Sequence, residues 1–97
     1  MRNIKSEFPD YDSILPSIKG FIDTSWHNDS CPSISKEIKD DCYYQIFCDY
    51  LDENKREYKG NSRYWITLQS NGIYSDPLFY CDTMEEIKEW VQLNLKS

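Results

Sequence analysis

The sequence lacks any long apolar run. None of its 97 residues belong to an apolar stretch of the ~18 residues that a helix needs to cross a membrane. The N-terminal stretch MRNIKSEFPDYDS also lacks the apolar h-region of a secretory signal peptide. The length suits one compact domain and leaves no room for a second. We therefore expect a single domain, residues 1–97, that is cytoplasmic and has no membrane partner.

The sequence also lacks an excess of positive charge. Acidic residues outnumber basic ones by 17 to 11, which gives a net charge of −6, and the surplus is spread over residues 1–42, 43–62 and 63–97. No segment has the basic surplus with which proteins bind phosphate backbones. This pattern argues against direct nucleic-acid binding and predicts that a charged partner is a basic protein. The same charge also confers solubility.

Residues that support catalysis or metal binding are few. His27 is the single histidine, and the four cysteines (Cys31, Cys42, Cys48 and Cys81) form no CxxC pair. The three glycines are isolated, so there is no glycine-rich phosphate loop. We predict that the protein is not an enzyme and has no cofactor or metal, and that its thiols are reduced, as is usual in the cytosol.

The polar stretch SWHNDSCPS, residues 25–33, is open to four interpretations. His27, Asp29 and Cys31 would form a metal site if an extended loop turned all three toward one point. His27 and Cys31 would form a nucleophilic pair if the imidazole lowered the thiol pKa. The Asn-Asp-Ser tripeptide is ordinary turn chemistry. Trp26 and His27 together are typical of a recognition loop.

Helical spacing occurs near both ends of the chain. Apolar residues between Tyr11 and Ile22 predict a helix of about ten residues that begins after Ser13. Thr83 and Glu86 form a capping box, which predicts a second helix with an apolar stripe of Met84, Ile87, Trp90, Val91 and Leu95. Between Asp23 and Asp41 we expect a long connection that contains at most one helical turn, over residues 35–40.

Alternating residues predict strands over 42–51 and 63–69. The Asn71-Gly72 turn then leads to a third strand, in two pieces around Asp76-Pro77. The predicted fold class is α+β: a small three-stranded antiparallel meander, with an N-terminal and a C-terminal helix packed on one face.

In that arrangement Tyr43, Phe47 and Trp65 point away from the core. They would form an aromatic surface rimmed by Asp49, Arg63 and Gln69, unless the 23–41 connection covers them. The predicted partner-binding residues are Trp26, His27, Asp29, Tyr43, Phe47, Asp49, Arg63 and Trp65.

The leading functional hypothesis is a small acidic binding protein that neutralises a macromolecular partner. Its class would be an immunity- or antitoxin-type inhibitor of a basic, nuclease-like toxin, in which carboxylates steer association and aromatic side chains anchor it. One alternative is a mobile-element anti-defence protein, such as an anti-CRISPR or a DNA mimic. A further alternative is a small thiol- or metal-dependent enzyme that uses His27 and Cys31.

Overall fold

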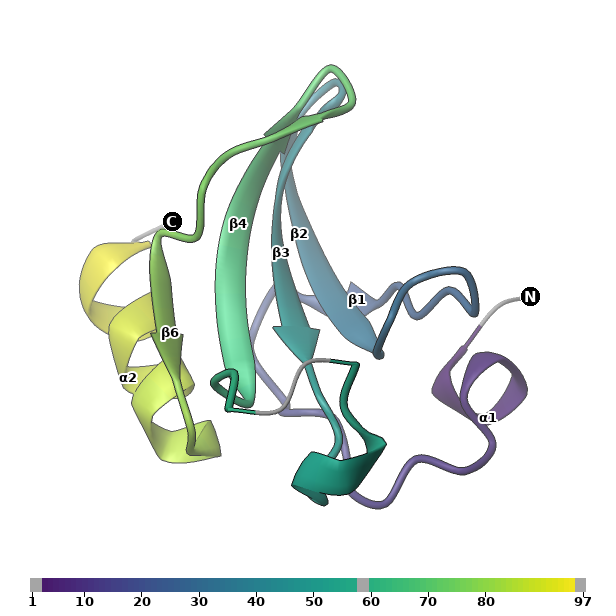
Figure 1. The fold of residues 1–97 in the computed structure, drawn as a ribbon. Helices are drawn as coiled ribbons and strands as arrows, with labels where there is room; N and C mark the ends of the chain where they lie inside the picture. The colour runs from purple at the N-terminus through teal and green to yellow at the C-terminus, as the bar shows by residue number, and fades with distance from the viewer. Residues whose placement is uncertain (1–2, 58–59, 96–97) are drawn as a thin grey trace.

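The computed structural model describes residues 3–57 and 60–95, in which six strands form one antiparallel sheet (Figure 1). The elements are α1 (Ile4–Glu7), β1 (Ile22–Asp23), β2 (Ser33–Lys39), β3 (Cys42–Cys48), the 3-10 turn η1 (Glu53–Lys55), β4 (Tyr64–Ser70), β5 (Ile73–Tyr74), β6 (Phe79–Cys81) and α2 (Met84–Asn94). The strand order is β1-β2-β3-β4-β5, and β6 also pairs with β4. The prediction of a three-stranded sheet with a helix at each end was therefore wrong.

The strands that sequence alternation marked are present. β3 pairs with β4 from Cys42↔Ser70 to Cys48↔Tyr64. On its other side β4 pairs with β5 and then with β6, so the third strand is interrupted around Asp76-Pro77 as predicted. Proline cannot donate to the ladder, which confines this interruption to the edge of the sheet.

The sequence pattern missed two strands, the two-residue β1 and the seven-residue β2. β2 pairs with β3 from Ser33↔Phe47 to Lys39↔Cys42, where a long connection with at most one helical turn was expected. Ser33 and Ser35 are buried at positions where apolar residues would reveal the alternation. Their hydroxyls are satisfied instead by hydrogen bonds, so burial here left no hydrophobic pattern to read.

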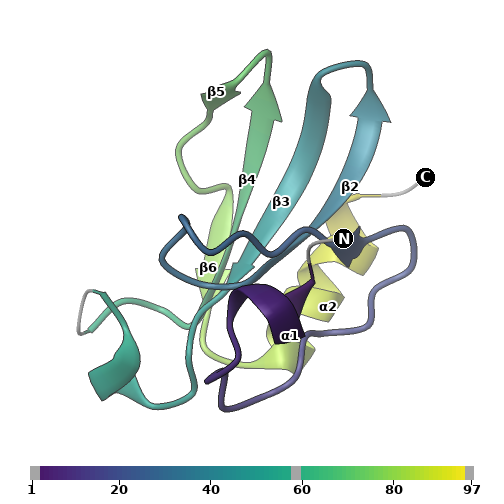
Figure 2. The same ribbon diagram turned by 90° about the vertical axis from the view of Figure 1, so that its right-hand side faces the viewer.

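The predicted N-terminal helix was also wrong. Residues 13–21 have no regular structure, and Ile14 and Ile22 are 71% and 69% exposed, although a core-facing helix would bury them. Leu15, Ile18 and Phe21 reach the core from an irregular segment. The short helix α1 lies earlier, capped by the side chain of Asn3, at the side of the molecule away from α2 (Figures 1 and 2).

The C-terminal helix is confirmed. Thr83 caps α2, because its hydroxyl accepts the backbone N–H of Glu86 at 3.2 Å and donates to the Glu86 carboxylate at 2.8 Å. Ile87 and Val91 are buried against one face of the sheet, in a core that also contains Ile34, Ile46, Cys48, Tyr64, Ile66 and Cys81. Only α2 therefore covers this face as a helix among the described residues. No helix in the described ranges is long and apolar enough to cross a membrane.

Candidate partner-binding face

The sheet face turned away from α2 carries aromatic side chains, because side chains alternate between the two faces of a strand. Phe47, Trp65 and Tyr80 lie directly opposite one another on β3, β4 and β6. Tyr43 and Tyr74 flank Gln69 on the neighbouring strands. We call these five aromatic residues the aromatic face. Tyr74 and Tyr80 are exposed, so the face is open to a partner over part of its area.

Three rings of the aromatic face are in contact. Phe47 stacks on Trp65, with ring centroids 5.2 Å apart and an interplanar angle of 18°. Phe47 also meets Tyr74, at 6.3 Å between centroids. Contacts of this kind fix the orientation of the rings beyond what their burial alone provides. The face therefore presents a preorganised aromatic surface.

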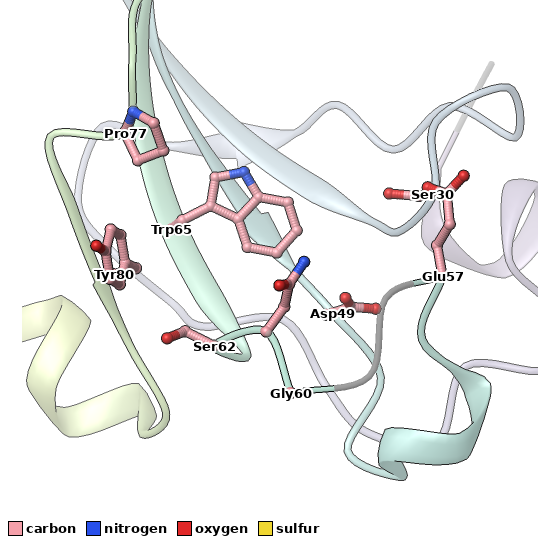
Figure 3. A pocket seen from close by; sticks show the side chains of 9 residues that line it. Ser30, Asp49, Glu57, Gly60, Ser62, Trp65, Pro77 and Tyr80 are labelled. Atoms are coloured by element: carbon pink, nitrogen blue, oxygen red, sulfur yellow. The ribbon is translucent and has the colours of Figure 1, made fainter.

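A first cavity, the Trp65 pocket, lies at one end of this face and has a volume of about 500 Å³. In Figure 3, Pro77 and Tyr80 lie on one side of the Trp65 ring, and the carboxyl groups of Asp49 and Glu57 lie on the other. Ser30, Gly60, Asn61 and Ser62 complete its lining. The pocket thus combines aromatic rings with carboxylates, which is chemistry suited to a cationic group.

Asp49 is the least exposed acidic residue of this pocket, at 3%. Its Oδ1 accepts the backbone N–H of Tyr50 at 2.9 Å. Burial raises the pKa of this carboxyl group above its ordinary value, although the Tyr50 hydrogen bond and the charges of Arg56 and Arg63 act in the opposite direction. An ionised Asp49 therefore costs the isolated fold free energy, which a cation in the pocket would offset.

The raised pKa predicts how Asp49→Asn changes stability with pH. The folded state holds the Asp49 proton more tightly than the unfolded chain does. Its contribution to the free energy of unfolding is therefore greatest below the unfolded pKa of about 3.9 and falls as pH rises toward the folded pKa. Asparagine keeps the acceptor for Tyr50 and cannot ionise. As pH rises from acidic to neutral, we therefore expect the stability of the variant to increase relative to that of the wild type, by on the order of 1 kcal/mol.

Urea denaturation at a series of pH values would measure this gain. A difference in unfolding free energy that shrinks with rising pH would contradict the prediction, because it would mean that the fold stabilises the ionised Asp49 carboxylate.

A second cavity, the Trp26 cavity, lies beside Tyr43 and Tyr74 and has a volume of about 590 Å³. Its lining comprises Gly20, Ile22, Thr24, Trp26, Asp29, Ser35, Glu37, Tyr43, Gln45 and Tyr74. Hydrogen bonds fix its polar side: the Thr24 hydroxyl is 2.7 Å from that of Ser35, and Gln45 Nε2 donates to the Ser33 hydroxyl at 2.9 Å. The cavity is therefore built by β2, β3, β5 and the segment that precedes β2.

The stretch SWHNDSCPS is both a connection between β1 and β2 and a part of these cavities. Trp26 and Asp29 line the Trp26 cavity, and Ser30 lines the Trp65 pocket. His27 lines neither, because its Nδ1 lies 2.7 Å from the Glu7 carboxylate of α1. That hydrogen bond holds the pKa of Glu7 below its usual range. His27 thus ties the segment to α1.

The geometry gives no support to a thiol or metal centre on this stretch. Cys31 is fully buried, and burial raises the pKa of its thiol, with the charges of Asp49 and Cys48 adding to the effect. A thiolate nucleophile needs a lowered pKa. Within residues 3–57 and 60–95, no three His, Cys, Asp or Glu side chains form a group that could hold a metal ion. All four cysteines are buried free thiols.

Arg63 is buried beside the pocket, where the sequence suggested a rim position. Its Nε donates to the Asp49 carbonyl oxygen at 3.2 Å, and its guanidinium lies over the Tyr64 ring at 4.8 Å from the centroid. The backbone of Asp49 also donates to the Arg63 carbonyl oxygen, at 2.8 Å. Arg63 therefore fixes the backbone at Asp49.

Six of the eight predicted partner-binding residues come together. Asp49 and Trp65 line the first cavity, Trp26, Asp29 and Tyr43 line the second, and Phe47 contacts both Trp65 and Tyr74. Sequence reasoning did not select Tyr74 or Tyr80. Their strands, β5 and β6, have two and three residues. So few residues do not show which side chains alternate toward which face of the sheet. The only signal for them was the register set by the Asn71-Gly72 turn.

Comparisons of the chain with protein-family models, with curated proteins and with solved structures found no match. A proposal about function therefore depends on the aromatic face and its two cavities.

Proposed function

We propose that this chain is a binding protein that neutralises a basic protein partner through the aromatic face. The class that fits is an immunity- or antitoxin-type inhibitor of a nuclease-like toxin. The observation that carries the proposal is the pairing, in one pocket, of the Trp65 ring with the buried carboxyl group of Asp49.

Protein interfaces draw most of their binding energy from a few aromatic side chains, surrounded by polar groups that exclude water. Trp65 and Phe47 form such a centre, and Asp49 and Glu57 supply negative charge beside it. The net charge of −6 adds a long-range attraction that raises the association rate with a basic partner.

The acidic residues of the two cavities favour a basic protein over mimicry of nucleic acid as the binding mode. A phosphate mimic presents its carboxylates in rows, whereas Asp29 and Glu37 lie among aromatic rings in one cavity and Asp49 and Glu57 do so in the other. Mixed aromatic and acidic surface is the chemistry of a protein interface.

The tagged full chain, incubated with lysate of its own host, tests the proposal. We expect one stoichiometric basic protein to be retained and to be released by salt, because exposed charge pairs are screened. Glu57→Lys, in the Trp65 pocket, should abolish retention. Glu89→Lys, an exposed position on α2 with the same change in charge, should retain the protein like wild type.

Mass spectrometry identifies the retained protein, and a parallel assay measures bound nucleic acid. Equal losses in the two variants would overturn the proposal, since net charge alone would then explain binding. Failure to retain any protein would overturn it as well.

A further inference from the structure

Buried polar side chains lie among the rings of the aromatic face. Gln45 and Thr67 face each other across β3 and β4, and Gln69 follows on β4. These three residues are only 5%, 5% and 9% exposed. Gln45 Oε1, Thr67 Oγ1 and Gln69 Oε1 have no hydrogen-bond partner among the described residues.

Such atoms need a physical reason. A buried acceptor without a donor costs the fold the desolvation of that group, and folded proteins contain few of them. Here three occur on one face of one sheet, and Gln45 is itself part of the lining of the Trp26 cavity. Two of the three atoms are amide oxygens, which accept hydrogen bonds and cannot donate them. A group that entered the cavity with N–H donors would meet this need at Gln45, the one of the three residues that lines it.

The surroundings of Gln45 add two further requirements. Three aromatic residues, Trp26, Tyr43 and Tyr74, line the cavity together with two acidic ones, Asp29 and Glu37. Asp29 lies close enough to Tyr43 and Tyr74 to add to the rise in pKa that burial causes in both phenols. Aromatic faces and negative charge both attract cations.

We propose that the Trp26 cavity binds an arginine side chain of the basic partner. The planar guanidinium stacks on an aromatic ring, donates an N–H to Gln45 Oε1 and is balanced by Asp29 and Glu37. Arginine fits better than lysine because its guanidinium is planar, carries several N–H donors and is more weakly hydrated than an ammonium group. This inference rests on the proposed function, and it identifies which side chain of the partner the Trp26 cavity binds.

Nuclear magnetic resonance titration of the full chain with L-argininamide tests the site. We expect saturable shifts of the Trp26 indole N–H and of the Gln45 carboxamide. Citrullinamide has the same shape with a neutral ureido group, so it should bind about tenfold more weakly or worse, as loss of charge-assisted hydrogen bonds implies. Equal affinity for the two probes, or shifts that map to the Trp65 pocket, would overturn the proposal.

A pair of tyrosine variants sharpens the test. Tyr74 lines the Trp26 cavity and Tyr80 lines the Trp65 pocket, and both are exposed on short edge strands. Tyr74→Leu should weaken argininamide binding about fivefold, as expected for the loss of one cation–π contact. Tyr80→Leu should leave it unchanged. Equal effects of the two would contradict a site in the Trp26 cavity.

The two proposals fail separately. Suppose that the chain retains a basic protein, that Glu57→Lys abolishes the retention, and that argininamide does not bind. Only the assignment of the Trp26 cavity is then overturned. If argininamide binds there while the lysate yields no basic protein, the neutralising function is overturned and the arginine site remains.

Discussion

Trp65→Ala is expected to weaken the retained partner's affinity by at least about 30-fold, equivalent to about 2 kcal/mol, which is the loss typical of a central interface tryptophan. Trp65 lies between Phe47 and Tyr80 on the aromatic face, stacked on the first and opposite the second. It also forms one wall of the pocket that holds Asp49. Its removal therefore takes away both the largest apolar contact and the ring beside the buried carboxyl group. Titration calorimetry with the purified partner measures the effect.

Trp90→Ala provides the matched control. Trp90 lies on α2 and stacks on Phe79 at 5.5 Å between centroids, on the other face of the sheet. Both substitutions remove a stacked tryptophan, so both should reduce stability, but only Trp65→Ala should reduce the affinity of the folded protein. Equal affinities for the two variants would show that the aromatic face is not the binding surface.

The parts of the fold that the sequence predicted are those whose local signals agree with their final environment. In β3 and β4, apolar residues alternate because one face meets the core. The helix α2 has a capping box and an apolar stripe that both point to the same element. Each of these segments could be read without knowledge of its neighbours.

The parts that the sequence did not predict depend on distant partners. β2 can bury its serines because they have hydrogen-bond partners on neighbouring segments. The Thr24 hydroxyl bonds those of Ser33 and Ser35, and the Gln45 amide donates to that of Ser33. The segment 13–21 shows helical spacing, yet it is irregular, and its Leu15, Ile18 and Phe21 side chains pack against the core contributed by distant strands. Neither set of partners is visible in local periodicity.

The candidate site was predicted in part for the same reason. The strand phase placed Tyr43, Phe47 and Trp65 on one face, since alternation is local information. The same alternation suggested that Arg63 is exposed, but its guanidinium finds a carbonyl acceptor and the Tyr64 ring in the interior. The carboxamides of Gln45 and Gln69 became notable only when the register placed Gln69 between Tyr43 and Tyr74 and Gln45 on the same face of the sheet.

The α2 side of the sheet is expected to hold the fold together, and Ile46→Ala tests this with the largest change in stability. Ile46 is fully buried and lies between Ile34 on β2 and Ile66 on β4, so three isoleucines cross the sheet beneath α2. Truncation to alanine should cost about 3 to 4 kcal/mol, and Ile46→Val about 1 kcal/mol. The first is a large part of the ~5–15 kcal/mol that stabilises an ordinary domain.

Urea denaturation measures both losses, with Ile73→Ala as the control. Ile73 is 74% exposed on the edge strand β5, so its truncation should change stability by about 0.5 kcal/mol or less. If Ile46→Ala cost no more than Ile73→Ala, stability would have to come from the aromatic face instead. The rings there would then be a second core, and the case for a binding surface would fail. A large loss at Ile46 would show that the isoleucine row beneath α2 is the main source of stability, which is what a recognition role for the opposite face requires.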